Sequence, residues 1–67
     1  MKPTIGRIVR YVNRSSEEWP AIIVAVHNDE LVNLQVFTSP TVIPAAKVPF
    51  DAAGGNFSWH WPERANG

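Results

Sequence analysis

The sequence contains no cysteine among its 67 residues, so no disulfide can cross-link the fold and no cysteine-based zinc site can form. Its hydrophobic fraction of 45% is ordinary for a folded protein and argues against disorder. A chain this short forms one domain at most, near the lower limit of what a single core stabilises. A second copy would add buried apolar area without lengthening the chain, so we expect a homo-oligomer.

Long apolar runs are also missing. No stretch of about eighteen apolar residues occurs, so the sequence predicts no membrane-spanning helix and no membrane partner. Residues 1–4 lack the apolar segment of a signal peptide. We therefore expect the protein in the cytoplasm of the cell that makes it.

Neither sign of charge is in excess, since six Lys and Arg balance six Asp and Glu. Proteins that bind long nucleic acid normally carry a net positive charge, so we expect no such partner. The cations do gather near the start of the chain, where Arg7 and Arg10 lie. Facing a cleft, either arginine can hold a small anionic ligand by bidentate hydrogen bonds. Solvated arginines that discourage pairing at a strand edge are the alternative.

Helix signals are weak throughout. Six prolines leave only residues 21–39 free for an amphipathic helix, and β-branched residues make that window strand-like. The clearest pattern is the alternation of apolar and polar residues over 31–37. The apolar run over 21–27 suits a strand covered on both sides, and Pro44 predicts a strand that is bent, bulged or at an edge. The five expected strands are 6–12, 21–27, 31–37, 42–48 and 57–61.

Five short strands with tight turns predict an all-β fold, a small five-stranded SH3-like barrel. The layout of the middle segment is similar to that of Tudor and KOW-type modules, and a five-stranded OB-type barrel is the alternative. We expect one domain over residues 1–67, ordered from about 4 to 62, with a frayed tail over 63–67.

The C-terminal segment is the most unusual stretch of the sequence. On a strand, Phe57, Trp59 and Trp61 share one face, while Ser58 and His60 share the other. Three aromatic side chains in one row form either a seam of the core or a platform on which a planar ligand stacks. Stacking of a base on an aromatic ring contributes about 1–3 kcal/mol.

A second pair of aromatic residues comes from the first half of the chain. In SH3-like barrels the start of the second strand flanks the ligand groove, so Trp19 and Tyr11 can wall one cleft, although Trp19 can also simply cap the barrel. The full set of candidate ligand-binding residues is Trp59, Trp61, Trp19, Tyr11, Arg7, Arg10, His60 and Arg64.

Metal binding and catalysis find little support in the sequence. His27 and His60 are far apart, and their spacing predicts no metal site. No nucleophile, base and oxyanion site can be named together, and Gly54-Gly55 does not form a phosphate-binding loop. We therefore expect a protein that is not an enzyme and has no cofactor.

Three segments carry a resemblance to a known group of proteins: TIGRIVRY over 4–11, VNLQVF over 32–37 and WHWPE over 59–63. They resemble the "TIGRIV-x-Y … VNLQV … W-x-W-P" pattern of small bacteriophage and prophage proteins. The resemblance extends from Thr4 to Arg64 and departs in the loops. It implies a viral origin and no particular activity.

These observations lead to one function hypothesis with alternatives. The first is a non-enzymatic phage protein that binds a small anionic planar ligand such as a cyclic nucleotide, sequestering a nucleotide signal of host immunity in an oligomer in the host cytoplasm. The alternative is a virion-associated or host-protein-binding adaptor. An enzyme similar in size to the small SH3-like plasmid-borne reductases would need an active pore between subunits.

Overall fold

A computed structural model describes residues 2–39 and 41–62. Within these residues the chain is all-β and has no helix, and therefore no helix long and apolar enough to cross a membrane. The strands are β1 (Ile8–Val12), β2 (Glu18–Val26), β3 (Leu31–Phe37), β4 (Val42–Pro49) and β5 (Ser58–His60). The expectation of a frayed tail falls on residues 63–67, outside the described part.

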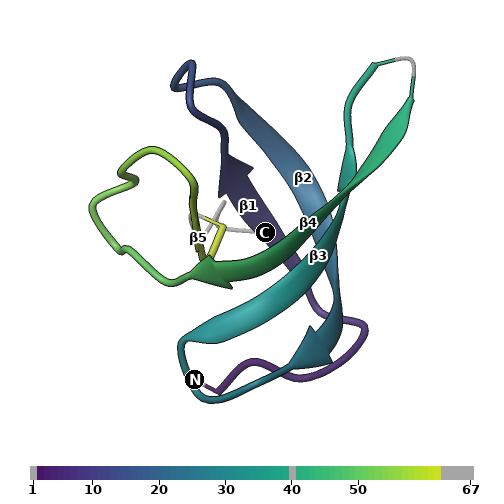
Figure 1. Cartoon of the computed structure of the whole chain (residues 1–67), viewed down its shortest axis with the longest axis vertical. Coiled ribbons are helices and arrows are strands. Elements are labelled where there is room, and N and C mark those ends of the chain that lie inside the picture. The colour runs from purple at the N-terminus through teal and green to yellow at the C-terminus, as the bar shows by residue number, and fades with distance from the viewer. Residues whose placement is uncertain (1, 40, 63–67) are drawn as a thin grey trace.

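All five strands belong to one antiparallel sheet in the order β4-β3-β2-β1-β5 (Figure 1). The sheet curls until its two ends approach, where Phe50, just after β4, forms a parallel bridge with Trp59 of β5. Asp51 extends this closure, because its backbone N–H donates to the Trp59 carbonyl at 2.9 Å. The resulting curled half-barrel is consistent with the predicted small SH3-like barrel.

The core lies inside the curl and follows from the period of two along each strand. On β3 the residues Val32, Leu34 and Val36 are buried, while Asn33 and Gln35 between them are only half-buried. The largest fully buried side chains are Trp59, Ile23, Leu34, Val9, Val32, Val36 and Val48. The alternation over 31–37 therefore predicted β3 and its inward face correctly.

The second strand differs from its prediction in two ways. It begins at Glu18 rather than at residue 21, because Glu18 and Trp19 pair with the end of β1. The expectation of cover on both sides is wrong, since Val24 and Val26 are 41% and 39% exposed. Both valines follow the alternation of the strand, which buries Ala21 and Ile23 and turns Val24 and Val26 outward.

Pro44 lies on β4 at the free edge of the sheet, where it pairs with Gln35 of β3. Proline has no N–H to donate, so an edge strand tolerates it and its outer side is poorly suited to pairing with another strand. The edge position is one of the three outcomes that the sequence left open for this proline.

The irregularity of β4 lies further along, at Lys47. The β3–β4 ladder shifts register between Val32 and Leu34, and Lys47 has a φ of 53° there. The Asn33 side chain accepts the Lys47 N–H at 2.8 Å, which replaces the missing ladder bond. An asparagine on the polar face of β3 thus stabilises a bend in its neighbour.

Two loops are tied together beside β5. Asn56, from the β4–β5 loop, accepts the Ser16 hydroxyl at 2.8 Å and donates from its side-chain nitrogen to the Arg14 carbonyl at 3.0 Å. The Arg14 guanidinium lies 5.3 Å from the centre of the Phe57 ring. Ser16 and Phe57 both have positive φ, at 64° and 54°. These contacts fix the C-terminal end of the β4–β5 loop against the loop between β1 and β2.

Candidate functional site

A hollow of about 430 Å³ lies between β5 and the loop that follows β4. This volume falls within the range of small-molecule binding sites, which is about 300–1,000 Å³. Its lining residues are Glu18, Phe50, Ala52, Ala53, Gly54, His60 and Trp61. Aromatic rings, small residues and two polar side chains thus meet at one place.

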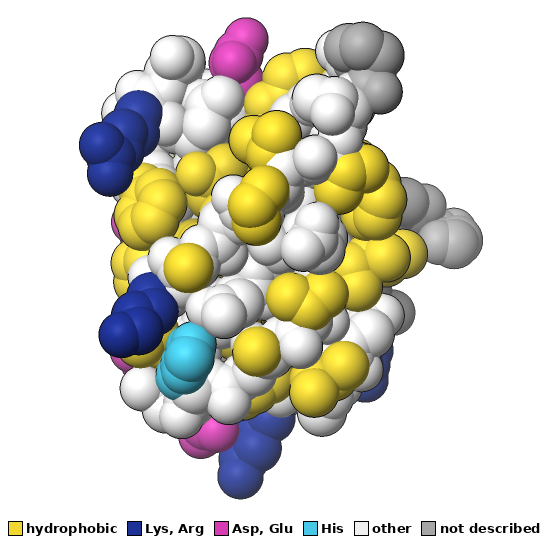
Figure 2. Space-filling model, turned by 45° about the vertical axis from the view of Figure 1, so that its right-hand side comes forward, with side chains coloured by type: hydrophobic (Ala, Val, Ile, Leu, Met, Phe, Trp, Pro, Cys, Tyr) yellow, Lys and Arg dark blue, Asp and Glu magenta, His cyan; other side chains and the backbone are white. Residues whose placement is uncertain are grey.

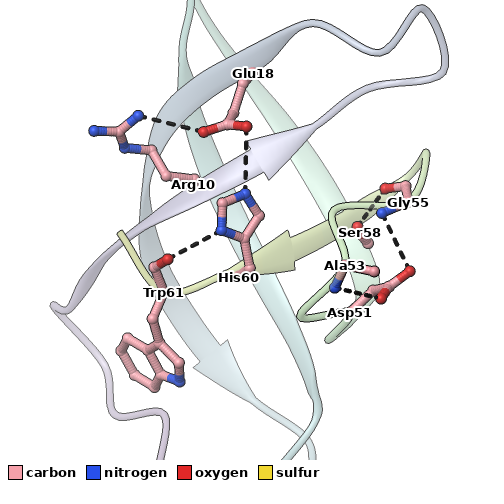
Figure 3. Close-up of polar contacts among 8 residues, drawn as sticks. All are labelled: Arg10, Glu18, Asp51, Ala53, Gly55, Ser58, His60 and Trp61. Carbon is pink, nitrogen blue, oxygen red and sulfur yellow. Dashed lines mark hydrogen bonds and ion pairs between the residues drawn. The ribbon is translucent and has the colours of Figure 1, made fainter. Parts of the chain in front are cut away.

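Asp51 shapes the loop wall of the hollow (Figure 3). Its carboxylate accepts the backbone N–H groups of Ala53 at 2.9 Å and Gly55 at 3.1 Å, and its carbonyl accepts that of Gly54 at 3.0 Å. The Ser58 hydroxyl donates to the Gly55 carbonyl and joins the loop to β5. The wall is therefore held in one shape by an aspartate that does not itself line the hollow.

Opposite this loop, three polar side chains form a chain of contacts across three strands (Figure 3). Arg10 Nη1 donates to Glu18 Oε1 at 3.3 Å, and His60 Nε2 lies 3.4 Å from Glu18 Oε2. The other ring nitrogen of His60, Nδ1, lies 3.0 Å from the Trp61 carbonyl oxygen. Both neighbours of the imidazole are acceptors, so only its doubly protonated form can donate to both at once.

The sheet order explains why these residues meet. β1 lies between β2 and β5, and Arg10 on β1 is the register partner of His60 on β5. Glu18 pairs with Val12, two residues further along β1, and so lies on the same outer face as Arg10. The Arg10–Glu18 pair is half-exposed, so it positions the carboxylate more than it stabilises the fold.

The two tryptophans of the C-terminal segment, Trp59 on β5 and Trp61 just after it, have different environments. Trp59 is 1% exposed, and its indole N–H donates to the Glu30 carbonyl at 2.8 Å, so it belongs to the core. Trp61 is half-buried and lines the hollow. The two indoles meet edge to face at 5.2 Å, and in Figure 3 the Trp61 indole extends to the side of His60 opposite Glu18. Of this pair, only Trp61 is placed to contact a ligand in the hollow.

Tyr11 and Trp19 are direct cross-strand partners, as a shared wall would require. They face inward, however, and neither lines the hollow. Tyr11 is 7% exposed and meets Phe57 edge to face at 6.2 Å. Burial raises the pKa of the Tyr11 hydroxyl, an effect that Arg14 nearby partly offsets, so the hydroxyl remains protonated at neutral pH.

The three candidate arginines are also separated. Arg10 contacts Glu18, which lines the hollow. Arg7 is exposed, precedes β1 and does not line the hollow. Arg64 lies outside the described residues. The hollow therefore has less positive charge than the sequence suggested, and its lining includes one carboxylate.

Sequence reasoning missed Glu18 and the whole wall formed by Phe50 and residues 52–54. Glu18 falls between the predicted strands 6–12 and 21–27, and only its pairing with Val12 at the end of β1 makes it part of β2. The wall depends on the path of a loop, and a loop has no periodic pattern of residues from which its path could be predicted.

Among residues 2–39 and 41–62, no group of three or more His, Asp or Glu side chains is close enough to hold a metal ion. Comparison with known proteins gives no relative: no family model, curated protein or solved structure matches the chain.

Proposed function

We propose that the protein is a non-enzymatic binding module that holds a small planar ligand, a nucleotide, in the hollow beside β5. The observation that carries the proposal is the convergence of Trp61, His60 and Glu18 on one cavity of ligand size. Aromatic surface with a few placed polar groups is the usual make-up of such sites. A nucleotide offers a planar base for the aromatic side and polar groups for the others.

Arg10 supports the nucleotide class in particular. Its guanidinium has five N–H donors, and its contact with Glu18 uses one nitrogen. The remaining donors can bind a phosphate at the border of the hollow, while the base occupies the interior. In its sharpest form, resting on the resemblance to phage proteins, the proposal is that the chain sequesters a nucleotide signal of host immunity in the host cytoplasm.

Thermal unfolding with added nucleotides tests this proposal. Cyclic dinucleotides, cyclic trinucleotides, ADP-ribose and mononucleotides are added separately at up to millimolar concentration. A ligand at a hundred times its Kd stabilises by about 2.7 kcal/mol, which raises the Tm of so small a domain by roughly 10–20 °C. Trp61→Ala should lower the affinity for that ligand by tenfold or more. Trp19→Ala, which removes a tryptophan outside the hollow, should leave the affinity unchanged. If none of these compounds shifts the Tm, the proposal is wrong.

A second candidate function is protein docking through the outer face of the sheet, with another copy of this chain as the occupant. Ile8 pairs with Ile22, and Phe37 pairs with Val42, so apolar residues adjoin one another there. Figure 2 shows hydrophobic side chains over much of one face of the molecule, with charged side chains toward its margins.

Sedimentation analysis of the wild type and Phe37→Lys tests the second candidate. The wild type should be a dimer at millimolar chain concentration, and the lysine should shift it to monomer, because an unpaired charge would be buried in the interface. The control is Ile5→Lys, which alters an apolar residue that is 71% exposed and lies outside the strands. A wild-type monomer at that concentration would rule this candidate out.

A further inference from the structure

The hollow contains a carboxylate with unused acceptor capacity. An ionised carboxylate has about four acceptor sites on its two oxygens. The structure gives Glu18 one contact on each oxygen, to Arg10 at 3.3 Å and to His60 at 3.4 Å. The Glu18 side chain is 45% exposed and lines the hollow, so each oxygen can still accept a hydrogen bond from a ligand.

Two adjacent acceptors on one group call for two adjacent donors on the ligand. The edge of guanine provides them, because its N1–H and its exocyclic N2 amino group lie side by side. Adenine offers one amino group beside a ring nitrogen that accepts, and that nitrogen would face a carboxylate oxygen. A carboxylate has no proton to give it, so the contact is repulsive. Hypoxanthine has the ring N–H but lacks the second amino group.

The charge around Glu18 suits an uncharged base. Arg10, and His60 when it is protonated, already compensate the carboxylate charge, so a ligand need not bring a cation to satisfy it. A guanidinium compound has the same pair of adjacent donors, but it would add a positive charge beside Arg10. The shared chemistry is thus a planar edge with two N–H donors, and the charge balance favours guanine.

We propose that Glu18 is the specificity-determining residue of the hollow and that it selects guanine nucleotides over adenine nucleotides. This inference rests on the function proposed above, and it names the class of ligand. Its basis is the position of the carboxylate in the lining, between Arg10 and His60 and across from the Asp51 loop.

Isothermal titration of the wild-type protein with GMP, IMP and AMP tests the inference. A bidentate contact to a base discriminates by about 5- to 150-fold, so GMP should bind more tightly than AMP within that range. IMP, which keeps one of the two donors, should lie between them. Agmatine serves as the guanidinium probe and should bind more weakly than GMP.

Glu18→Gln provides an independent test, because this substitution nearly preserves the shape of the side chain. A glutamine amide has one acceptor and one donor group, which match adenine better than guanine. The preference for GMP over AMP should therefore collapse or reverse. The matched control is Glu17→Gln, which makes the same chemical change on a neighbouring residue that contacts Asn13 and does not line the hollow. Its preference should equal that of the wild type.

The outcomes separate the two proposals. Equal affinity of the wild type for GMP and AMP, or a preference that survives Glu18→Gln, overturns the role of Glu18 while nucleotide binding stands. Binding of agmatine more tightly than GMP overturns the choice of guanine. Failure of every nucleotide to bind overturns the proposed function itself, and the inference with it.

Discussion

Replacing Trp59 with alanine should leave a large fraction of the protein unfolded at 25 °C. Trp59 is among the largest fully buried side chains, and it contacts Phe50 and Trp61 edge to face at 4.9 and 5.2 Å. Removing a buried Phe or Trp side chain costs about 3–5 kcal/mol. A domain of 67 residues has a total stability of roughly 3–10 kcal/mol, so the loss is comparable with the whole. Urea unfolding followed by far-UV circular dichroism measures it.

Two further variants show which interaction of Trp59 is responsible. Trp59→Phe keeps most of the ring but loses the N–H that donates to the Glu30 carbonyl, so it should cost less than the alanine variant and more than about 1 kcal/mol. Trp61→Ala removes an indole that is only half-buried and should cost less than Trp59→Ala. A Trp59→Ala protein with the urea midpoint of the wild type would contradict the core position of this residue.

The sequence predicted the regular part of this fold because strand periodicity is local. On β3, three apolar residues alternate with two polar ones, and the structure buries Val32, Leu34 and Val36 as that pattern requires. The closure by β5 was also foreseeable, since a short aromatic segment after a turn can complete a small barrel. What periodicity could not give was the extent of β2, whose first residues are set by their partners on β1.

The difference between Trp59 and Trp61 shows a second limit. Alternation over the predicted strand 57–61 places both on one face, and yet Trp59 is buried in the core and Trp61 borders a cavity. Position along the barrel decides this, because Trp59 lies where Phe50 closes the sheet and Trp61 lies beyond the end of the strand. The spacing of residues in the sequence indicates the face of a strand on which a residue lies, but not how far along the barrel it lies.

The candidate site was harder still to predict, because it joins residues distant in sequence. Glu18 and His60 meet only because β1 separates β2 and β5 in the sheet, and the ladder on each side of β1 has a particular register. A shift by one residue on either side would turn one of these side chains to the other face. Residue type alone proposed His60 and Arg10, whereas Glu18 needed the topology.

The loop wall of the hollow should depend on Asp51 for both its shape and its ligand. Asp51→Ala removes the acceptor of two backbone N–H groups, those of Ala53 and Gly55. Hydrogen bonds to a charged group contribute about 1.5–3 kcal/mol, so we expect a loss of stability in this range together with weaker nucleotide binding. Asp51→Asn keeps one acceptor oxygen and should recover part of both. Urea unfolding and isothermal titration measure the two effects.

Asp29→Ala is the control, because Asp29 is an exposed aspartate in the β2–β3 turn, away from the hollow. It should change stability by less than about 0.5 kcal/mol, the usual limit for surface substitutions. If Asp51→Ala behaved like this control, the aspartate would not be organising the loop.

Gly55→Ala tests the shape of the loop wall separately from the charge of Asp51, because it leaves the aspartate in place. A Cβ atom on Gly55 would come within 2.5 Å of the Asp51 carboxylate oxygen, so the alanine should push that carboxylate away and reproduce much of the Asp51→Ala defect. In a chain that already has Asp51→Ala the obstructing oxygen is gone, and the same alanine should cost little. The two substitutions should therefore be strongly non-additive in a double-mutant cycle. Simple additivity would mean that the contact between Asp51 and Gly55 does not hold the wall. The fixed shape of the hollow could then not be attributed to this contact.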